Sequence, residues 1–148
     1  MNDWRAKLRT IAYNGLRIVA GAAYFSHGAQ KLFGWFGGFG PEGGTAVLMT
    51  RFGAAGVIEV VCGAAIVLGL LTRPAAFLAS GEMAVAYFWM HAGRSGELFW
   101  WANRGELVML FCFVWLFYVA HGAGSFSLDA WLARRRAVAS GSMSAAET

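Results

Sequence analysis

Ionisable side chains interrupt the apolar stretches of this sequence, at positions where they could transfer protons or stabilise a developing negative charge. In the stretch GAAYFSHGAQKLF, a histidine and a lysine lie one helical turn apart, so on a helix they share a face. Two later apolar stretches each contain one glutamate. A charged side chain is costly inside a membrane, so each of these residues is a candidate for a function. We take four residues as candidate catalytic residues: His27, Lys31, Glu59 and Glu82.

The depth of these residues indicates which of them could meet. Counted from the helix ends that flank the connection 34–50, His27 and Glu59 are both ~10 Å deep at 1.5 Å per residue. A buried carboxylate must be paired or protonated, so Lys31 or His27 is the expected partner of Glu59. Glu82 could pair with Arg17 or His27. The cations Arg17 and Lys31 would then balance the two glutamates.

Each of these residues also has a structural explanation. The ammonium group of Lys31 could extend to the membrane surface, and His27 could be a hydrogen-bonded packing residue. A cation at the end of a helix, as at His91, interacts favourably with the helix dipole, and Glu106 could cap the start of a helix. We keep three residues as candidates for cofactor binding: Arg17, His91 and Glu106.

The composition indicates that membrane-embedded helices position these residues. Of the 148 residues, 58% are hydrophobic and 14% are charged, which is too apolar for an ordinary soluble domain. Apolar stretches close to the length that crosses ~30 Å of hydrocarbon occur at residues 11–33, 52–71, 74–91 and 105–121. The chain has room for about four such helices and for no soluble catalytic domain. We therefore predict an all-α fold, a polytopic membrane four-helix bundle with a short C-terminal interfacial helix.

The connections between the stretches indicate how the helices are arranged. The segment LLTRPAA is so short that the second and third helices must form an antiparallel hairpin, and Pro74 suits the first turn of a helix. Asn103 and Glu106 have the spacing of a capping box that would open the fourth helix. Gly21 and Gly28 predict a face of the first helix on which another helix packs closely.

The positive charges predict how the chain is oriented. One side of the membrane would receive Arg5, Lys7, Arg9, Arg73, Arg134, Arg135 and Arg136. The other side would receive Lys31, Arg51, Arg94 and Arg104. Because cytoplasmic loops carry an excess of Lys and Arg, both termini should be cytoplasmic in a multi-pass protein of the inner (plasma) membrane. This placement explains the net charge of +4 without a nucleic-acid partner.

The two ends of the chain differ in character. Near the start, Arg17 interrupts the apolar run, which favours a retained first span over the alternative of a cleaved signal peptide. Near the other end, Ser127 could cap a short helix that carries Leu128 and Trp131 before a run of arginines, as in helices that lie on anionic membranes. We predict a membrane domain over residues 1–133 and a cytoplasmic tail over 134–148 that is basic and then disordered.

The cysteines argue against several classes of site. Cys62 and Cys112 lie in different apolar stretches, and the sequence has no C-x-x-C pair. Neither a disulfide framework nor a zinc site is indicated, so we predict no metal site. A membrane enzyme that forms disulfide bonds would need a further cysteine pair, so this class is disfavoured.

Five segments together resemble the DoxX family of membrane proteins. In order, they are RIVAGAAYFSHGAQKLFG, IEVVCGAAIVLGLLTRPAA, MAVAYFWMHA, NRGELVMLFCFVWL and GAGSFSLD, and they cover about residues 17 to 129. The resemblance implies a four-helix membrane bundle. The motif positions that it carries over are Arg17, His27, Gly28, Lys31, Glu59, Gly63, Arg73, Met83, His91, Asn103, Gly105 and Glu106. The segment RSGELFWW departs from the proline-containing connection expected before the fourth helix.

The family takes its name from a subunit associated with quinone-linked thiosulfate oxidation, so the resemblance implies a redox-linked role. We expect a subunit of a quinone-linked redox assembly, with a polar pocket in the outer half of the membrane and a quinone as cofactor. Trp89, Trp100, Trp101 and Trp115 could stack on its ring, although interfacial belts and core packing produce the same composition.

The partners follow from the same expectation. Electrons would come from redox partner proteins, because the sequence has no haem, flavin or iron–sulfur signature. The lipid bilayer and further copies of the chain are the other expected partners. Two alternatives remain open from the sequence: a subunit of a proton or small-solute transporter, and a non-catalytic membrane scaffold.

Overall fold

The backbone of this chain is predominantly helical. A computed structural model describes residues 3–146, and side chains over residues 3–139. The long helices are α1 (Trp4–Phe33), α2 (Arg51–Leu68), α3 (Thr72–Ala86), α6 (Glu106–His121) and α7 (Leu128–Ala146). The shorter elements are the 3₁₀ helix η1 (Trp35–Gly37), the π-helix η2 (Tyr87–Ala92), α4 (Gly93–Ser95) and α5 (Trp100–Asn103). No β-strand occurs in the described residues, so the prediction of an all-α fold is confirmed.

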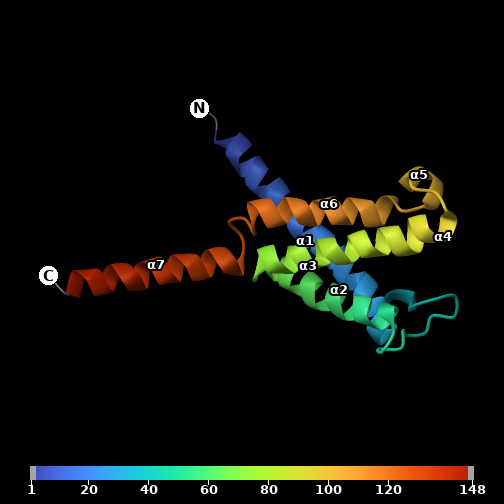
Figure 1. Cartoon of the computed structure of the whole chain (residues 1–148). Coiled ribbons are helices and arrows are strands. Elements are labelled where there is room, and N and C mark those ends of the chain that lie inside the picture. Colours follow the sequence, from blue (N-terminus) through green and yellow to red (C-terminus); the bar gives the residue numbers. More distant parts are fainter. Residues whose placement is uncertain (1–2, 147–148) are drawn as a thin grey trace.

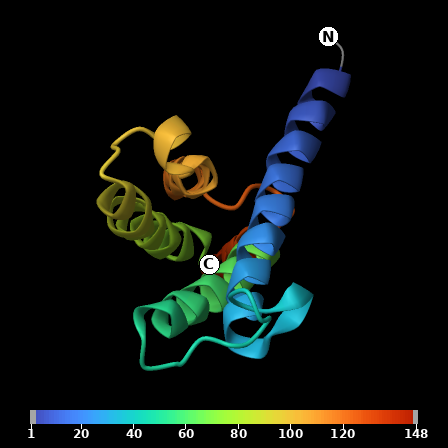
Figure 2. The same ribbon diagram turned by 90° about the vertical axis from the view of Figure 1, so that its right-hand side faces the viewer.

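Close helix pairs build the fold. α1 packs along α2, α6 packs along α3, and the hairpin of α2 and α3 joins the two pairs (Figures 1 and 2). A Cβ atom added at Gly28 would lie 2.7 Å from the backbone nitrogen of Val60, and one at Gly63 would lie 2.8 Å from that of Phe25. A larger residue could not approach so closely, so the predicted close-packing face of α1 around Gly28 is confirmed.

A core of buried side chains lies between these helices. Trp115, Tyr118 and Ile66 are each 0% exposed. The rings of Phe111 and Trp115 stack with their centroids 5.7 Å apart, and the ring of Tyr24 meets that of Trp115 at 5.3 Å. These side chains belong to one cluster of buried residues that joins α1, α2, α3 and α6.

The outer surface of the helices is apolar. Val19 on α1 is 69% exposed and Phe77 on α3 is 64% exposed, and large apolar side chains are also exposed on α2 and α6. A water-soluble monomer rarely exposes so much contiguous apolar surface. Within the part of the chain that the structure describes, α2 is the one helix that is long and apolar enough to cross a membrane by length and composition, and α6 is a shorter apolar helix.

Arg17 fastens α1 to the junction end of the fold, which we define as residues 66–73 and 121–129. The Arg17 side chain is 1% exposed, and its guanidinium donates hydrogen bonds to the carbonyl oxygens of Ile66, of Val67 at 2.7 Å and of Phe126 at 2.5 Å. The last carbonyl groups of a helix have no partner inside that helix. Arg17 therefore satisfies the C-terminus of α2 and holds the connection that follows α6.

Asp129 closes the junction end from the other side. Its carboxylate accepts hydrogen bonds from the backbone N–H of Leu71 at 2.8 Å and of Thr72 at 3.0 Å. A residue of α7 thereby caps the start of α3. The hydroxyl of Tyr13 donates to the carbonyl oxygen of Gly122 at 2.6 Å, which binds the GAGSFS connection to α1.

The predicted capping box at the start of α6 is wrong. Gly105 is the N-cap residue, and the side chain of Glu106 makes no capping hydrogen bond. Arg104 has a left-handed backbone conformation with φ of 59°, which turns the chain between α5 and α6. Asn103 is therefore the last residue of α5, and its Oδ1 accepts a hydrogen bond from the N–H of Gly105 at 2.8 Å.

The C-terminal helix is longer than predicted. α7 runs from Leu128 to Ala146 and projects away from the other helices in Figure 1. The cap at Ser127 is confirmed, because its hydroxyl oxygen accepts a hydrogen bond from the N–H of Ala130 at 3.2 Å. The predicted domain boundary at residue 133 falls inside this helix, and residues 134–146 are helical rather than disordered. The segment lacks proline and is rich in alanine and arginine, which favour helix. Residues 147–148 of the predicted tail lie outside the described residues.

Candidate functional site

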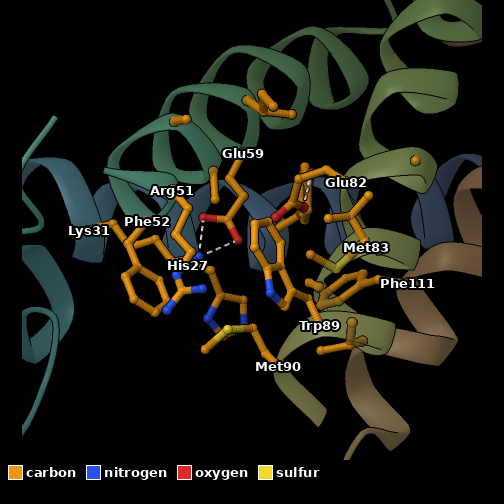
Figure 3. A pocket seen from close by; sticks show the side chains of 18 of the residues that line it. His27, Lys31, Arg51, Phe52, Glu59, Glu82, Met83, Trp89, Met90 and Phe111 are labelled. Atoms are coloured by element: carbon orange, nitrogen blue, oxygen red, sulfur yellow. Dashed lines mark hydrogen bonds and ion pairs between the residues drawn. The ribbon is translucent and has the colours of Figure 1, made fainter. Parts of the chain in front are cut away.

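A cavity of about 710 Å³ lies toward the loop end of the fold, which we define as residues 31–52 and 87–106. Side chains from α1, α2, α3, η2 and α6 line it (Figure 3). The apolar part of the wall includes Phe52, Ile58, Met83, Met90 and Phe111. The structure also brings all four candidate catalytic residues to this cavity: His27, Lys31, Glu59 and Glu82.

Lys31 and Glu59 form an ion pair across the contact of α1 and α2. The ammonium nitrogen of Lys31 lies 2.5 Å from each carboxylate oxygen of Glu59. The side chain of Glu59 is 3% exposed and that of Lys31 is 17% exposed, so the cation is the member nearer to open space. Lys31 is one of the two partners expected for Glu59. The pair is complete in itself, because the ammonium neutralises the carboxylate charge.

Glu82 has a different partner from the two that were expected. Its Oε2 accepts a hydrogen bond from the hydroxyl of Tyr24 at 2.9 Å, which links α3 to α1. The prediction that Glu82 pairs with Arg17 or His27 is wrong, since Glu82 forms no ion pair among the described residues. One helical turn separates Tyr24 from His27, so a tyrosine on the same face of α1 takes the place of the cation.

The two histidines of the cavity differ in how they are held. His27 is half-buried and meets the ring of Phe111 edge to face, with centroids 6.2 Å apart. His91 stacks on Tyr87, and its Nδ1 lies 3.2 Å from the carbonyl oxygen of Asn103. A carbonyl oxygen can only accept, so Nδ1 of His91 is the donor in this hydrogen bond. The Nε2 atom of His91 is therefore the nitrogen left to bind another group.

A π-helical segment forms one wall of the cavity. Residues 87–92 continue α3 without a break, and the N–H of Gly93 bonds to the carbonyl oxygen of Phe88, five residues earlier. Such segments are rare and often occur at functional sites. Here the segment supplies Trp89, Met90 and His91 to the cavity. The sequence YFWMHA contains no glycine or proline, so no local signal marked this change of helix type.

Comparisons with known proteins place the chain. The DoxX family model matches residues 13–92, which is more than half of the chain. The chain belongs to the DoxX family. It is 42% identical over 119 residues to an uncharacterized protein of Haemophilus influenzae, with 77% of this chain and 85% of that protein covered. No solved structure matches the chain. As a DoxX family member, the protein is a helical membrane protein.

The DoxX match contains most of the polar wall of the cavity. Residues 13–92 include His27, Lys31, Glu59, Glu82 and His91, and they end at the last residue of η2. α6 lies beyond the matched segment and contributes apolar residues to the cavity. The chemistry-bearing side chains are therefore part of the DoxX unit.

Two of the residues proposed for cofactor binding do not line the cavity of this DoxX protein. Arg17 precedes His27 by ten residues, or about 15 Å along α1, and its hydrogen bonds lie at the junction end. The expected balance of Arg17 with a glutamate is wrong, because backbone carbonyl groups satisfy the guanidinium instead. Glu106 is exposed at the start of α6, outside the cavity lining. Of the three candidates, His91 alone lies in the cavity wall.

Sequence reasoning missed Tyr24 and Arg51 in the DoxX cavity. Tyr24 could have been found from its spacing to His27, whereas Arg51 had been assigned only to membrane topology. The guanidinium carbon of Arg51 lies 5.2 Å from the ring centroid of Trp89. Of the tryptophans considered for stacking, Trp89 lines the cavity, Trp115 lies in the core, and Trp100 and Trp101 are exposed.

Proposed function

We propose that this DoxX family protein is a subunit of a quinone-linked redox assembly and that its cavity binds the quinone ring. One observation carries the proposal: apolar walls enclose two separate polar groups, the Lys31–Glu59 ion pair and the hydrogen bond from Tyr24 to Glu82. The volume of about 710 Å³ suits a small-molecule site, for which ~300–1,000 Å³ is usual. A quinone supplies two-electron, two-proton chemistry, and a ring of this kind needs apolar contacts on its faces and polar partners for its oxygens.

The residues of the cavity have separate roles in this proposal. The carboxyl group of Glu82 exchanges a proton with a bound oxygen, and the Tyr24 hydroxyl at 2.9 Å orients that carboxyl group. The ammonium group of Lys31, held by Glu59, stabilises negative charge that develops on an oxygen. His27 supplies a second group that can exchange a proton, opposite the ring of Phe111. A partner protein supplies the electrons.

The packing supports a multi-pass arrangement in the inner (plasma) membrane, with both termini cytoplasmic. α1, α2, α3 and α6 alternate in direction, and their outward side chains are apolar. Two cations of α1 lie within its membrane-spanning part, but both have partners there. Arg17 bonds to carbonyl groups and Lys31 bonds to Glu59, so neither charge faces lipid alone. The first turns of α1, the junction end and α7 together carry most of the Lys and Arg residues, so they would face the cytoplasm.

Binding and turnover of a short-chain quinone test this proposal. We expect the purified protein to bind the analogue and Glu82→Gln to weaken binding about tenfold, since the carboxyl O–H that donates to a quinone oxygen is replaced by a weaker amide donor. In membranes that contain the natural partners, the same variant should lower the rate of quinone reduction. Glu97→Gln is the matched control, because Glu97 is exposed at the loop end and outside the cavity lining. Unchanged turnover in Glu82→Gln at normal protein level would remove the proposal.

A non-catalytic scaffold is the second candidate function. The observation that favours it is the Lys31–Glu59 pair, which joins α1 to α2. A scaffold role predicts that a partner protein is still captured when both residues are neutralised in Lys31→Met/Glu59→Gln, provided that the variant folds. Proton or solute flux in proteoliposomes without an electron donor would instead favour the transporter alternative.

A further inference from the structure

The mouth of the cavity contains a guanidinium group held by aromatic rings. Arg51 is the first residue of α2 and lines the cavity. Its guanidinium carbon lies 5.4 Å from the ring centroid of Phe52 and 5.2 Å from that of Trp89, which belongs to η2. Cation–π attraction of this kind fixes a positive charge where two helices meet.

The N–H donors of Arg51 have no oxygen acceptor within the described residues. The ion pairs found there are Lys7–Asp3 and Lys31–Glu59, and neither includes Arg51. Contacts with ring faces hold the charge but leave the donor fork of the guanidinium without an anion. That fork matches the oxygens of a phosphate group better than any other side chain does.

A shallow apolar hollow adjoins the cavity at Trp89. It has a volume of about 430 Å³ and is lined by Ala84, Val85, Phe88 and Trp89. Val85 and Trp89 also line the cavity, so these two residues form a shared wall. Val85, Phe88 and Trp89 are exposed, and the hollow therefore faces the lipid that surrounds a membrane protein. An acyl chain is the apolar partner that this environment supplies.

We propose that Arg51, Trp89 and this hollow form a binding site for an anionic phospholipid. The phosphate group accepts hydrogen bonds from Arg51, and one acyl chain lies in the hollow between Ala84 and Phe88. Charge complementarity selects the ligand, since Arg51 and the adjacent Lys31–Glu59 pair sum to one positive charge at the mouth. The lipid lies beside the cavity, so this site does not depend on what the cavity itself binds.

Retention of lipid by the purified protein tests the headgroup contact. Native mass spectrometry compares bound phosphatidylglycerol with bound phosphatidylcholine, supplied in equal amounts. We expect wild-type protein to prefer phosphatidylglycerol and Arg51→Gln to lower its retention about tenfold, the loss of a charge-assisted contact. Arg51→Lys should lose less, because the charge stays while the fork is lost. Arg94→Gln is the control, an exposed arginine at the same end that does not line the cavity.

Two further measurements separate this lipid from other occupants. Ala84→Phe fills the hollow and should lower the retention of both lipids while the preference between them stays unchanged. Inorganic phosphate is titrated against lipid-free protein in detergent, and binding that depends on Arg51 would assign the site to free phosphate. Equal retention of the two lipids by wild-type protein, or an equal loss in Arg51→Gln and Arg94→Gln, would overturn the proposal.

Discussion

The junction end and the cavity both contain buried ionisable groups, but they satisfy them differently. At the junction end, backbone groups bond to Arg17 and Asp129, so those charges complete the ends of helices. At the cavity, side chains face open space, and Glu82 has a tyrosine hydroxyl as its partner. A buried charge bound by backbone carbonyl groups therefore stabilises the fold. In the proposed function, a charge that faces the cavity is instead one that a ligand can reach.

The largest expected effect is at the junction end. Arg17→Met removes the donor for the carbonyl oxygens of Val67 and Phe126 and one of the two donors for Ile66, whose oxygen still accepts from the N–H of Gly69. Each buried carbonyl left without a partner costs ~1–3 kcal/mol, so we expect a loss of about 2–6 kcal/mol in the free energy of unfolding, measured by denaturation in detergent. Arg51→Gln is the control, since Arg51 is exposed and should change the stability by about 0.5 kcal/mol at most. Equal losses in the two variants would show that the charge at the junction end stabilises the fold no more than the charge at the cavity does.

The second effect concerns the ion pair of the cavity. Lys31→Met leaves the carboxylate of Glu59 buried without its cation, which we expect to cost about 3 kcal/mol. The double variant Lys31→Met/Glu59→Gln should recover most of this loss, because the unpaired charge is gone. A double-mutant cycle on unfolding measures the coupling. Losses that simply add would show that the two side chains act independently.

The third effect concerns the α1–α2 contact that supports the cavity. Gly28→Ala places a methyl group 2.7 Å from the backbone nitrogen of Val60, so the helices must move apart. We expect a loss of about 2 kcal/mol, read as a lower unfolding midpoint. Gly15→Ala is the control, because an added Cβ there meets no atom within 4 Å and removes a helix glycine. That control should be neutral or slightly stabilising.

A smaller effect is expected at the cap of α3. Asp129→Ala removes the acceptor for the N–H groups of Leu71 and Thr72 and should cost about 1 kcal/mol. Hydrogen exchange should show the loss as faster exchange in the first turn of α3, while exchange in η2 stays unchanged. Asp129→Asn should restore part of the protection, since an amide oxygen can still accept.

The smallest effect on stability is expected at the cavity acid. Glu82→Gln keeps an acceptor for the Tyr24 hydroxyl, so the unfolding free energy should change by about 0.5 kcal/mol or less. The same variant should lower quinone binding, as proposed above. A large loss of stability in Glu82→Gln would show that Glu82 stabilises the fold. The ionisable groups of the cavity would then have the same role as those of the junction end.

The sequence allowed the main elements and one contact of the site to be predicted. The apolar stretch 52–71 corresponds to α2 at Arg51–Leu68. Counting depth along two helices placed Glu59 level with His27 and left Lys31 or His27 as its partner, and Lys31 is the one that forms the ion pair. These inferences succeed because helix rise and residue spacing are local properties. The role of Arg17 was missed because its partners are carbonyl groups, which every residue has and which no sequence pattern marks. The cavity is the space left between side chains of five elements. Hydrophobic periodicity describes one helix at a time, so it could not reveal this space.

The π-helical turn at residues 87–92 lets one continuous helix meet two demands: α3 packs on α6, and η2 turns its side chains toward the cavity. In an α-helix each residue advances about 100° around the axis. The residues of α3 that pack on α6 would therefore also fix which later residues face the cavity. The wider turn absorbs an additional residue and resets that angle. If the same residues were wound as a regular α-helix, the stretch beyond the segment would be turned by about 100° around the axis, and other side chains would face the cavity.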